Sequence, residues 1–165
     1  MPAGHRIRGR WFRVLKPRYA HEPLSGRGAE LTGGRFNRPG RAAFYLSADP
    51  LTAYAEYTAS GYDKPGLMCS YDVDVSPIAD LTDAGVCAEQ GVSSDDLARR
   101  WIGVPDAPTH IVSDRLIQAG FVGAMFSSIQ HRDGVNMVLW AWDKPDADIR
   151  LVDRLSEAPT KPMAD

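Results

Sequence analysis

The sequence has few cysteines and no long apolar run. Cys69 and Cys87 are the only two cysteines in 165 residues, and the four histidines are scattered. Two isolated cysteines cannot build a disulfide framework, and no cysteine or histidine has the spacing of a zinc site. The first residues are charged and lack the apolar stretch of a signal peptide or membrane span. We therefore expect a cytoplasmic protein without a structural metal.

The sequence also lacks the two common glycine-rich phosphate motifs. None of its fifteen glycines falls into GxGxxG or GxxxxGK[ST], which argues against a Rossmann or Walker nucleotide site. With 44% hydrophobic and 24% charged residues, the composition is that of an ordinary globular protein. We expect one domain over residues 1–165, with a core from about 8 to 152 and a flexible, proline-bearing tail from 153 to 165.

Charge is unevenly distributed along the chain. Residues 1–41 hold ten lysines and arginines against two acidic residues, while the remainder holds nine basic and nineteen acidic residues. Arginine outnumbers lysine fifteen to four, and the planar guanidinium suits bidentate contacts with phosphate. A solvated surface would explain any one of these arginines, but as a group they indicate an anionic partner. We favour a nucleotide or diphosphate over nucleic acid, because the basic segment has neither a recognition-helix pattern nor regularly interleaved aromatics.

Hydrophobic periodicity predicts a mixed α+β fold. We expect loops or irregular chain over 19–31 and 78–91 and a short helix from 93 to 101. The other expected elements are strands at 8–15, 42–46, 67–75, 121–126 and 136–142 and helices at 50–59 and 109–119. Strands and helices do not alternate regularly, which argues against a doubly wound parallel sheet.

The helix over 50–59 has the strongest local signals. Asp49 can accept hydrogen bonds from the free amides of the first turn, and Pro50 suits the first helical position. Leu51, Tyr54 and Ala55 have helical spacing and are the expected apolar stripe. This helix follows a glycine-flexed arginine turn and a short strand, so three consecutive elements must pack against one another.

The order of these signals resembles the RES-domain family, the toxin half of RES–Xre toxin–antitoxin pairs. The matching segments within residues 11–142 are WFRV, SGRGA, GGRFN, FYLSADPLTAYAEY and FSS…GVNMVLW. The resemblance implies an ADP-ribosyltransferase-like fold with a mixed β-sheet core that consumes NAD+. It also implies an inhibitory antitoxin with an Xre-like DNA-binding part that covers the NAD+ pocket.

Carried over by position, the implied site contains Arg35, Tyr45, Glu56 and one late serine. The family often has tryptophan where Phe36 stands, and a Pro-Ser pair where this chain has Phe126-Ser127-Ser128. We favour Ser127 over Ser128 as the site serine.

Each of these residue types suits cleavage of the nicotinamide–ribose bond. Glu56 can stabilise the oxocarbenium-like sugar or deprotonate the acceptor, although many helix glutamates only face solvent. Arg35 can bind the diphosphate, with Arg13 as a second donor. Tyr45 can stack on nicotinamide or simply be a core residue, and Ser127 can contact ribose or be a turn residue. Tyr19 and Asn136 are further candidate ligand contacts.

The sequence leaves the acceptor of ADP-ribose open. We place first the transfer of ADP-ribose to a cellular protein target, a mono-ADP-ribosyltransferase activity. The alternative is an NAD+ glycohydrolase or phosphorylase that depletes NAD+. A hypothesis of another class is a non-catalytic module that binds a nucleotide or RNA through the basic segment of residues 1–41.

Overall fold

The computed structural model describes residues 3–59, 61, 65–143 and 147–158, with only the backbone described for 153–158. Its strands are β1 (His5–Leu15), β2 (Phe44–Ser47), β3 (Gly66–Asp80), β4 (Gly123–Ser127), β5 (Val135–Leu139) and β6 (Ala147–Ala158). Its helices are the 3-10 turn η1 (Pro17–Tyr19), α1 (Arg27–Thr32), α2 (Pro50–Ala59), α3 (Ala84–Glu89), α4 (Ser94–Ala98) and α5 (Pro108–Gln118). The predicted α+β class is confirmed.

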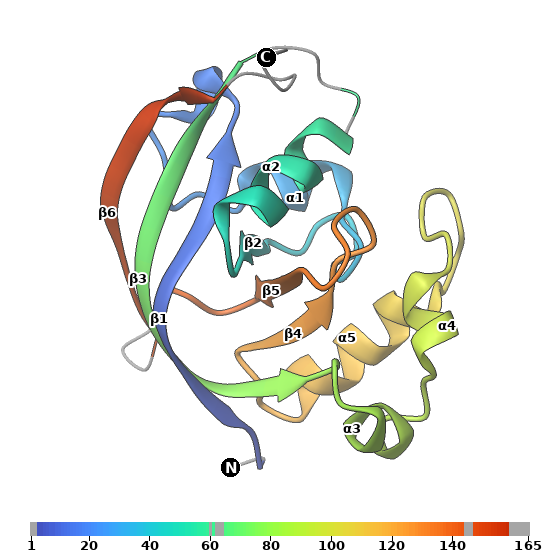
Figure 1. The fold of residues 1–165 in the computed structure, drawn as a ribbon. Coiled ribbons are helices and arrows are strands. Elements are labelled where there is room, and N and C mark those ends of the chain that lie inside the picture. The colour runs from blue at the N-terminus through green and yellow to red at the C-terminus, as the bar shows by residue number, and fades with distance from the viewer. Residues whose placement is uncertain (1–2, 60, 62–64, 144–146, 159–165) are drawn as a thin grey trace.

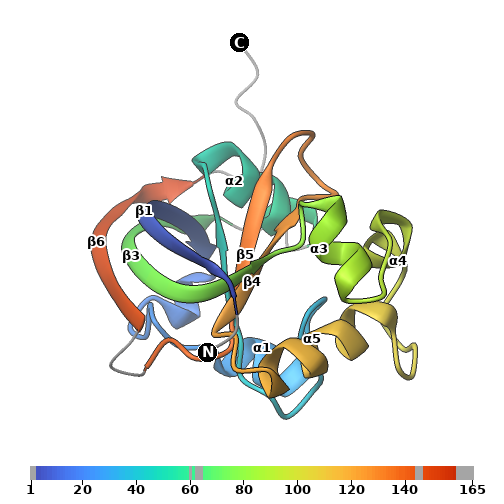
Figure 2. The ribbon, with the colours of Figure 1, turned by 90° about the horizontal axis from the view of Figure 1, so that it is seen from below.

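The six strands form one sheet that curls back on itself (Figure 1). Their order is β1-β2-β5-β4-β3-β6, and β1 also pairs with β3, which closes the circuit. All pairs are antiparallel except β3 with β4. Seen from below, β1, β3 and β6 form one curved wall, and α3, α4 and α5 lie on the other side of β4 and β5 (Figure 2).

Strand β3 shows why this sequence makes such a wall. Cys69, Tyr71, Val73 and Val75 alternate inward and are buried, while Asp72 and Asp74 between them point outward. Asp74 accepts hydrogen bonds from Arg6 of β1, with nitrogen–oxygen distances of 2.7 and 2.8 Å. The period of two that predicted a half-buried strand is therefore confirmed over this stretch.

At its start, the polar side of β3 is covered rather than solvated. Strand alternation puts Met68 and Ser70 on the same side as Asp72 and Asp74, which predicts that they face water, but both are buried. Met68 packs in a small cluster with Val14 of β1 and with Ala53 and Tyr57 of α2. The prediction was wrong here because α2 lies across this end of the sheet, a tertiary contact that strand periodicity does not encode.

The buried face of α2 also differs from the expected one. Its buried residues are Thr52, Ala53 and Tyr57. Leu51, which belonged to the predicted apolar stripe, is 68% exposed. The helix bounds and the Asp49 cap are as predicted, but the helix is rotated so that the side bearing Thr52 and Glu56 meets the β4–β5 turn.

Three further segments differ from expectation. Residues 27–32 form α1 where a loop was predicted, and residues 84–89 form α3 where irregular chain was predicted. The tail expected from residue 153 overlaps β6, since residues 153–158 pair with β3 as far as Gly66 opposite Ala158, and its flexibility stays a prediction. Residues 159–165 lie outside the described part of the chain.

Candidate functional site

Helix α2 is fixed at its start by Asp49. The carboxylate of Asp49 accepts from the Thr52 amide at 2.9 Å and from the Thr52 hydroxyl at 2.7 Å. Thr52 is fully buried against Gly134 of the β4–β5 turn, where an added Cβ would stand 2.6 Å from the Thr52 hydroxyl. Glycine thus permits the turn to press on the helix, and this contact brings Glu56 to the end of β4.

Glu56 is the centre of a hydrogen-bonded network. Its Oε1 accepts from the Ser128 hydroxyl at 2.6 Å and from the side-chain amide of Asn136 at 2.8 Å. The buried Asn136 is itself oriented by Ser47, whose hydroxyl donates to its Oδ1 at 2.7 Å. Ser47 and Asn136 lie opposite each other in the β2–β5 register. The described residues supply no donor to Oε2 of Glu56, so one carboxylate oxygen is held and the other is available to a ligand.

Arg35 is presented by a tight turn. Gly34 and Asn37 exchange backbone hydrogen bonds of 3.0 and 3.4 Å, and the preceding Gly33 has a positive φ of 76°. His110 of α5 also contacts this turn, with its Nε2 2.8 Å from the Gly34 carbonyl oxygen. The local sequence GGRFN therefore folds into a rigid support for one guanidinium.

The Arg35 guanidinium is held by main-chain carbonyl groups. It donates to the Leu97 carbonyl of α4 through Nε, at 2.9 Å, and through Nη2, and to the Ser127 carbonyl at 3.4 Å through Nη1. The Phe36 and Phe126 rings each lie 5.3 Å from its central carbon. Burial lowers the pKa of Arg35, and the negative charge of Glu56 opposes that shift. The two groups thus share one electrostatic environment, although no ion pair joins them among the described residues.

Tyr45 supports this turn through its hydroxyl. The hydroxyl donates to Asn37 Oδ1 at 2.7 Å and accepts from the Phe36 amide at 2.9 Å. Its ring meets Phe126 edge-on, with ring centroids 6.5 Å apart. Burial raises the pKa of Tyr45, so the phenol stays protonated. These contacts support the turn that presents Arg35, and stacking of the Tyr45 ring on nicotinamide stays a prediction.

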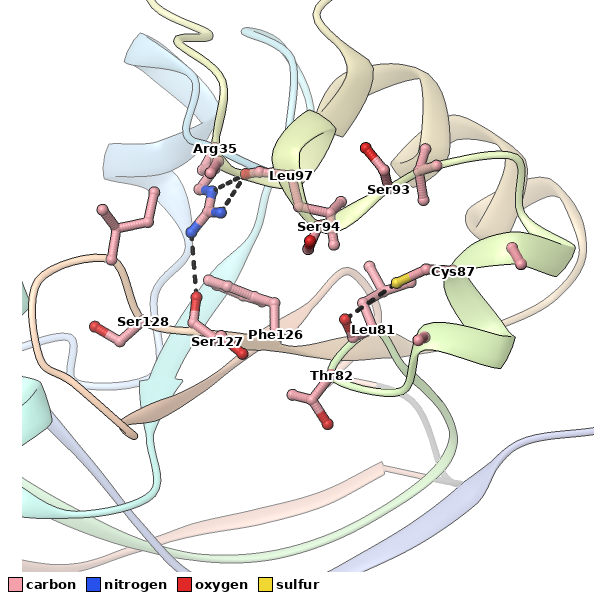
Figure 3. A pocket seen from close by; sticks show the side chains of 15 residues that line it. Arg35, Leu81, Thr82, Cys87, Ser93, Ser94, Leu97, Phe126, Ser127 and Ser128 are labelled. Carbon is pink, nitrogen blue, oxygen red and sulfur yellow. Dashed lines mark hydrogen bonds between the residues drawn. The ribbon is translucent and has the colours of Figure 1, made fainter.

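A cavity of about 570 Å³ opens beside Arg35 (Figure 3). In the figure, Arg35 and Ser128 lie toward one end of the cavity, and α3 with Cys87 lies at the other. Ser127 and Ser128 line the cavity, and Ser128 also contacts Glu56. Glu56 does not line the cavity itself, but the Ser128 hydroxyl connects it to the surface at which Arg35 contacts Ser127.

The chain matches the family model of the RES domain over residues 10–160. It belongs to the RES-domain family. Its fold is similar to that of a chain in the crystal structure of the M. tuberculosis MbcT–MbcA toxin–antitoxin complex, with a TM-score of 0.71 and 20% sequence identity. That similarity covers 94% of this chain and 86% of the other. No curated protein matches the sequence.

Two candidates of this RES domain lie outside the Arg35–Glu56 cluster. Arg13 donates to the Ser25 carbonyl at 3.5 Å and lies 4.7 Å from the centre of the Phe44 ring, and burial lowers its pKa. Tyr19 lies in η1, under the Arg18 guanidinium at 4.9 Å. Neither contacts Arg35 or Glu56 in the described interactions. The expectation that Arg13 is a second diphosphate donor beside Arg35 therefore has no support in these contacts.

Sequence reasoning missed several parts of this candidate site. The hydroxyl on Glu56 belongs to Ser128 and not to the favoured Ser127, which contributes its carbonyl to Arg35. Ser47, the Leu97 carbonyl and His110 were also missed. Ser47 directly follows the strand predicted at 42–46, and that position is the only signal for it in the sequence.

The described residues contain neither a membrane-spanning helix nor a cluster of metal ligands. No helix there is long and apolar enough to cross a membrane. In the same part of the chain, no three or more His, Cys, Asp or Glu side chains gather as a metal would require.

Proposed function

We propose that this RES domain binds NAD+ as its substrate and cleaves the nicotinamide–ribose bond, acting as the toxin of a toxin–antitoxin pair. The observation that carries the proposal is that two consecutive cavity residues, Ser127 and Ser128, contact the partly desolvated Arg35 guanidinium and the Glu56 carboxylate, which is held through one oxygen. Breaking the C1′–nitrogen bond leaves its electron pair on nicotinamide and positive charge on the ribose. A carboxylate oxygen can stabilise that charge, and a guanidinium can bind the diphosphate.

Each side chain has a distinct part in this reaction. Glu56 uses its free Oε2 toward the ribose or the incoming acceptor, while Ser128 and Asn136 hold Oε1 in place. The acceptor adds its oxygen or nitrogen to C1′ and loses one proton, so the products are nicotinamide, an ADP-ribosyl acceptor and a proton. A protein side chain, water and phosphate all meet this requirement, and the products distinguish them.

The experiment is nicotinamide release from NAD+ by the purified protein, with and without phosphate and with and without a cell lysate. Glu56→Gln is the matched control, because the amide oxygen can still accept from Ser128 and Asn136. We expect release by the native protein and loss of release in the variant. Product masses then identify free ADP-ribose, a phosphorylated ADP-ribose or a modified protein. Absence of nicotinamide under every condition would contradict the proposal, and nucleic-acid binding that tolerates Glu56→Gln would favour the binding-module hypothesis.

We further propose a cognate antitoxin that covers the cavity. The proposal extends to the present chain the partnership seen in the similar crystal structure, which holds a toxin and an antitoxin in one complex. Expression of the native protein alone should arrest growth with falling NAD+ or with modified protein, and Glu56→Gln should not. Growth unaffected by an active, expressed protein would contradict the toxin role and leave the chemistry intact.

A further inference from the structure

We infer that the end of the cavity between α3, α4 and β4 is the binding site for the adenosine half of NAD+. This inference rests on the proposed function, because it assigns the remainder of the substrate to the remainder of the same cavity. It depends on the order of chemical groups along the cavity, on the character of its walls and on how those walls are held.

The chemical groups follow the order of the parts of NAD+. Ser128 lines one end, with Glu56 bonded to its hydroxyl from outside the lining, and Arg35 comes next, bonded to the Ser127 carbonyl. Beyond Arg35, the cavity continues past Leu97 to Cys87 and Ala88 of α3 (Figure 3). NAD+ presents a nicotinamide ribose, then a diphosphate, then adenosine. A ligand with its ribose at Glu56 and its diphosphate at Arg35 therefore places adenosine against α3 and α4.

The walls at that end suit a purine nucleoside. Leu81, Val92, Leu97 and Phe126 supply apolar surface, and Thr82 and Ser94 place hydroxyl groups on the same lining. Small-molecule sites combine mostly apolar walls with a few polar groups, in volumes of roughly 300–1,000 Å³. The cavity, at about 570 Å³, lies within that range. Among the residues that line the cavity, Arg35 is the one charged side chain. The lining therefore has no carboxylate for an ammonium ligand, and no cation besides Arg35 for a carboxylate ligand.

Cys87 contributes apolar wall rather than reactive surface. Its thiol donates to the Leu81 carbonyl with a sulfur–oxygen distance of 3.2 Å, and the residue is 5% exposed. Burial raises the pKa of Cys87, with a further contribution from the charge of Asp83, so the thiol stays neutral.

The two helical walls are held before any ligand arrives. Asp83 caps α3, with its Oδ1 accepting from the amides of Gly85 at 2.7 Å and Val86 at 3.1 Å. Ser93 and Asp96 form a reciprocal capping box on α4, with distances of 3.1 and 3.0 Å. Arg35 ties α4 to the active-site turn through the Leu97 carbonyl. A pre-formed subsite spares the ordering cost of binding.

The experiment fills this end of the cavity with tryptophan at Ala88, an exposed lining residue of α3. Its matched control is Glu89→Trp on the next residue of the same helix, which is exposed and does not line the cavity. Both changes are made in the Glu56→Gln background, so that NAD+ is bound without turnover. Calorimetry measures the affinities for NAD+, AMP and nicotinamide mononucleotide, and circular dichroism checks the fold.

We expect Ala88→Trp to weaken AMP and NAD+ by about tenfold or more, with nicotinamide mononucleotide unchanged and Glu89→Trp without effect. Ser94→Trp, from the opposite wall, should act like Ala88→Trp and replaces it if that variant does not fold. Unchanged AMP affinity in the folded filling variants, or a loss confined to nicotinamide mononucleotide, overturns the subsite while NAD+ binding stands. A Glu56→Gln protein that binds none of the three ligands overturns the proposed function itself.

Discussion

The two charged ends of the site are held in different ways. Glu56 is held by side chains, with Ser128 and Asn136 donating to it and Ser47 orienting Asn136. Arg35 is held by the backbone, through the carbonyl groups of Leu97 and Ser127. At the carboxylate end, substitution can remove one contact at a time. At the guanidinium end, the contacts of Leu97 and Ser127 survive substitution of those residues, so only Arg35 itself can be changed.

Because of this difference, substitutions at the two ends should distinguish effects on catalysis from effects on the stability of the fold. Removing the guanidinium leaves the part-buried Leu97 carbonyl oxygen without its donor, which costs folding free energy. Replacing the carboxylate with an amide keeps an acceptor oxygen in the same place. Substitutions at the two ends should therefore differ in their effect on stability even where they have the same effect on catalysis.

The largest expected effect belongs to Arg35→Lys. An ammonium cannot reproduce the guanidinium fork that reaches Leu97 and Ser127, so kcat/KM for NAD+ should fall about 100-fold or more. The melting temperature should fall as well, by the equivalent of about 1–3 kcal/mol. Glu56→Gln should lose comparable activity with its melting temperature kept. Nicotinamide release and thermal unfolding measure both, and equal stability losses in the two variants would remove the contrast.

Asn136→Asp should change the pH profile of the carboxylate end. The new carboxyl would stand 2.8 Å from Glu56, and two such groups share a proton, which raises the pKa of the pair. Above that pKa residue 136 has no proton to donate, and activity should fall roughly tenfold. At lower pH the protonated aspartic acid donates as the amide did, so the optimum should move toward acid. Asn136→Ala is the control, and a loss that is equal at every pH would contradict the positioning role of Asn136.

Ser128→Ala and Ser127→Ala form the next comparison. Ser128 donates its hydroxyl to Glu56, so its loss should lower kcat by about tenfold. Ser127→Ala keeps the carbonyl that Arg35 uses, so its effect should be about twofold or smaller. Steady-state kinetics of both variants decide between the two neighbouring serines. A larger loss at Ser127 would restore the assignment favoured from the sequence.

The smallest effect is expected at Asp74→Asn, on the curved wall of β1 and β3. Hydrogen bonds from Arg6, and then from Arg8, lower the pKa of Asp74 from its ordinary value of 3.8 to about 2. The carboxylate therefore stabilises the folded state above about pH 4 and loses that contribution as the pH falls toward 2. The variant should melt slightly lower at neutral pH, and the difference should vanish near pH 2. Thermal melts across pH measure it, with unchanged nicotinamide release as the control, and a difference that persists at pH 2 would refute the charge origin.

Much of the fold could be predicted because its signals are local. Asp49 and Pro50 begin α2 through contacts within a few residues, and the alternation along β3 records which side chains are buried. The strand character of 153–158 could not be predicted, because it depends on backbone pairing with β3 some eighty positions earlier. The face of α2 was misjudged for the same reason, since Leu51 is exposed by the position of the sheet.

The sequence could suggest Arg35 and Glu56 because their charges suit the proposed reaction, and their role in it stays a prediction. The structure connects both residues to the end of β4, at Ser127 and Ser128. The contact of Arg35 with the Leu97 carbonyl could not be predicted, because every residue has a main-chain carbonyl and none is marked in the sequence. The choice between Ser127 and Ser128 depends on where β4 ends, and strand ends are the least certain feature of a sequence pattern.

Strand β3 links the two larger hydrophobic clusters. Its first part contributes Cys69, Tyr71 and Val75 to the cluster behind the curved wall, and Ala79 near its end belongs to the cluster beneath α5. Cleavage of the polypeptide within this strand would therefore disrupt the packing of both clusters at once. The Arg35–Glu56 cluster and the long strands of the curved wall should accordingly melt together, and fragments divided there should have no stable structure until they are recombined.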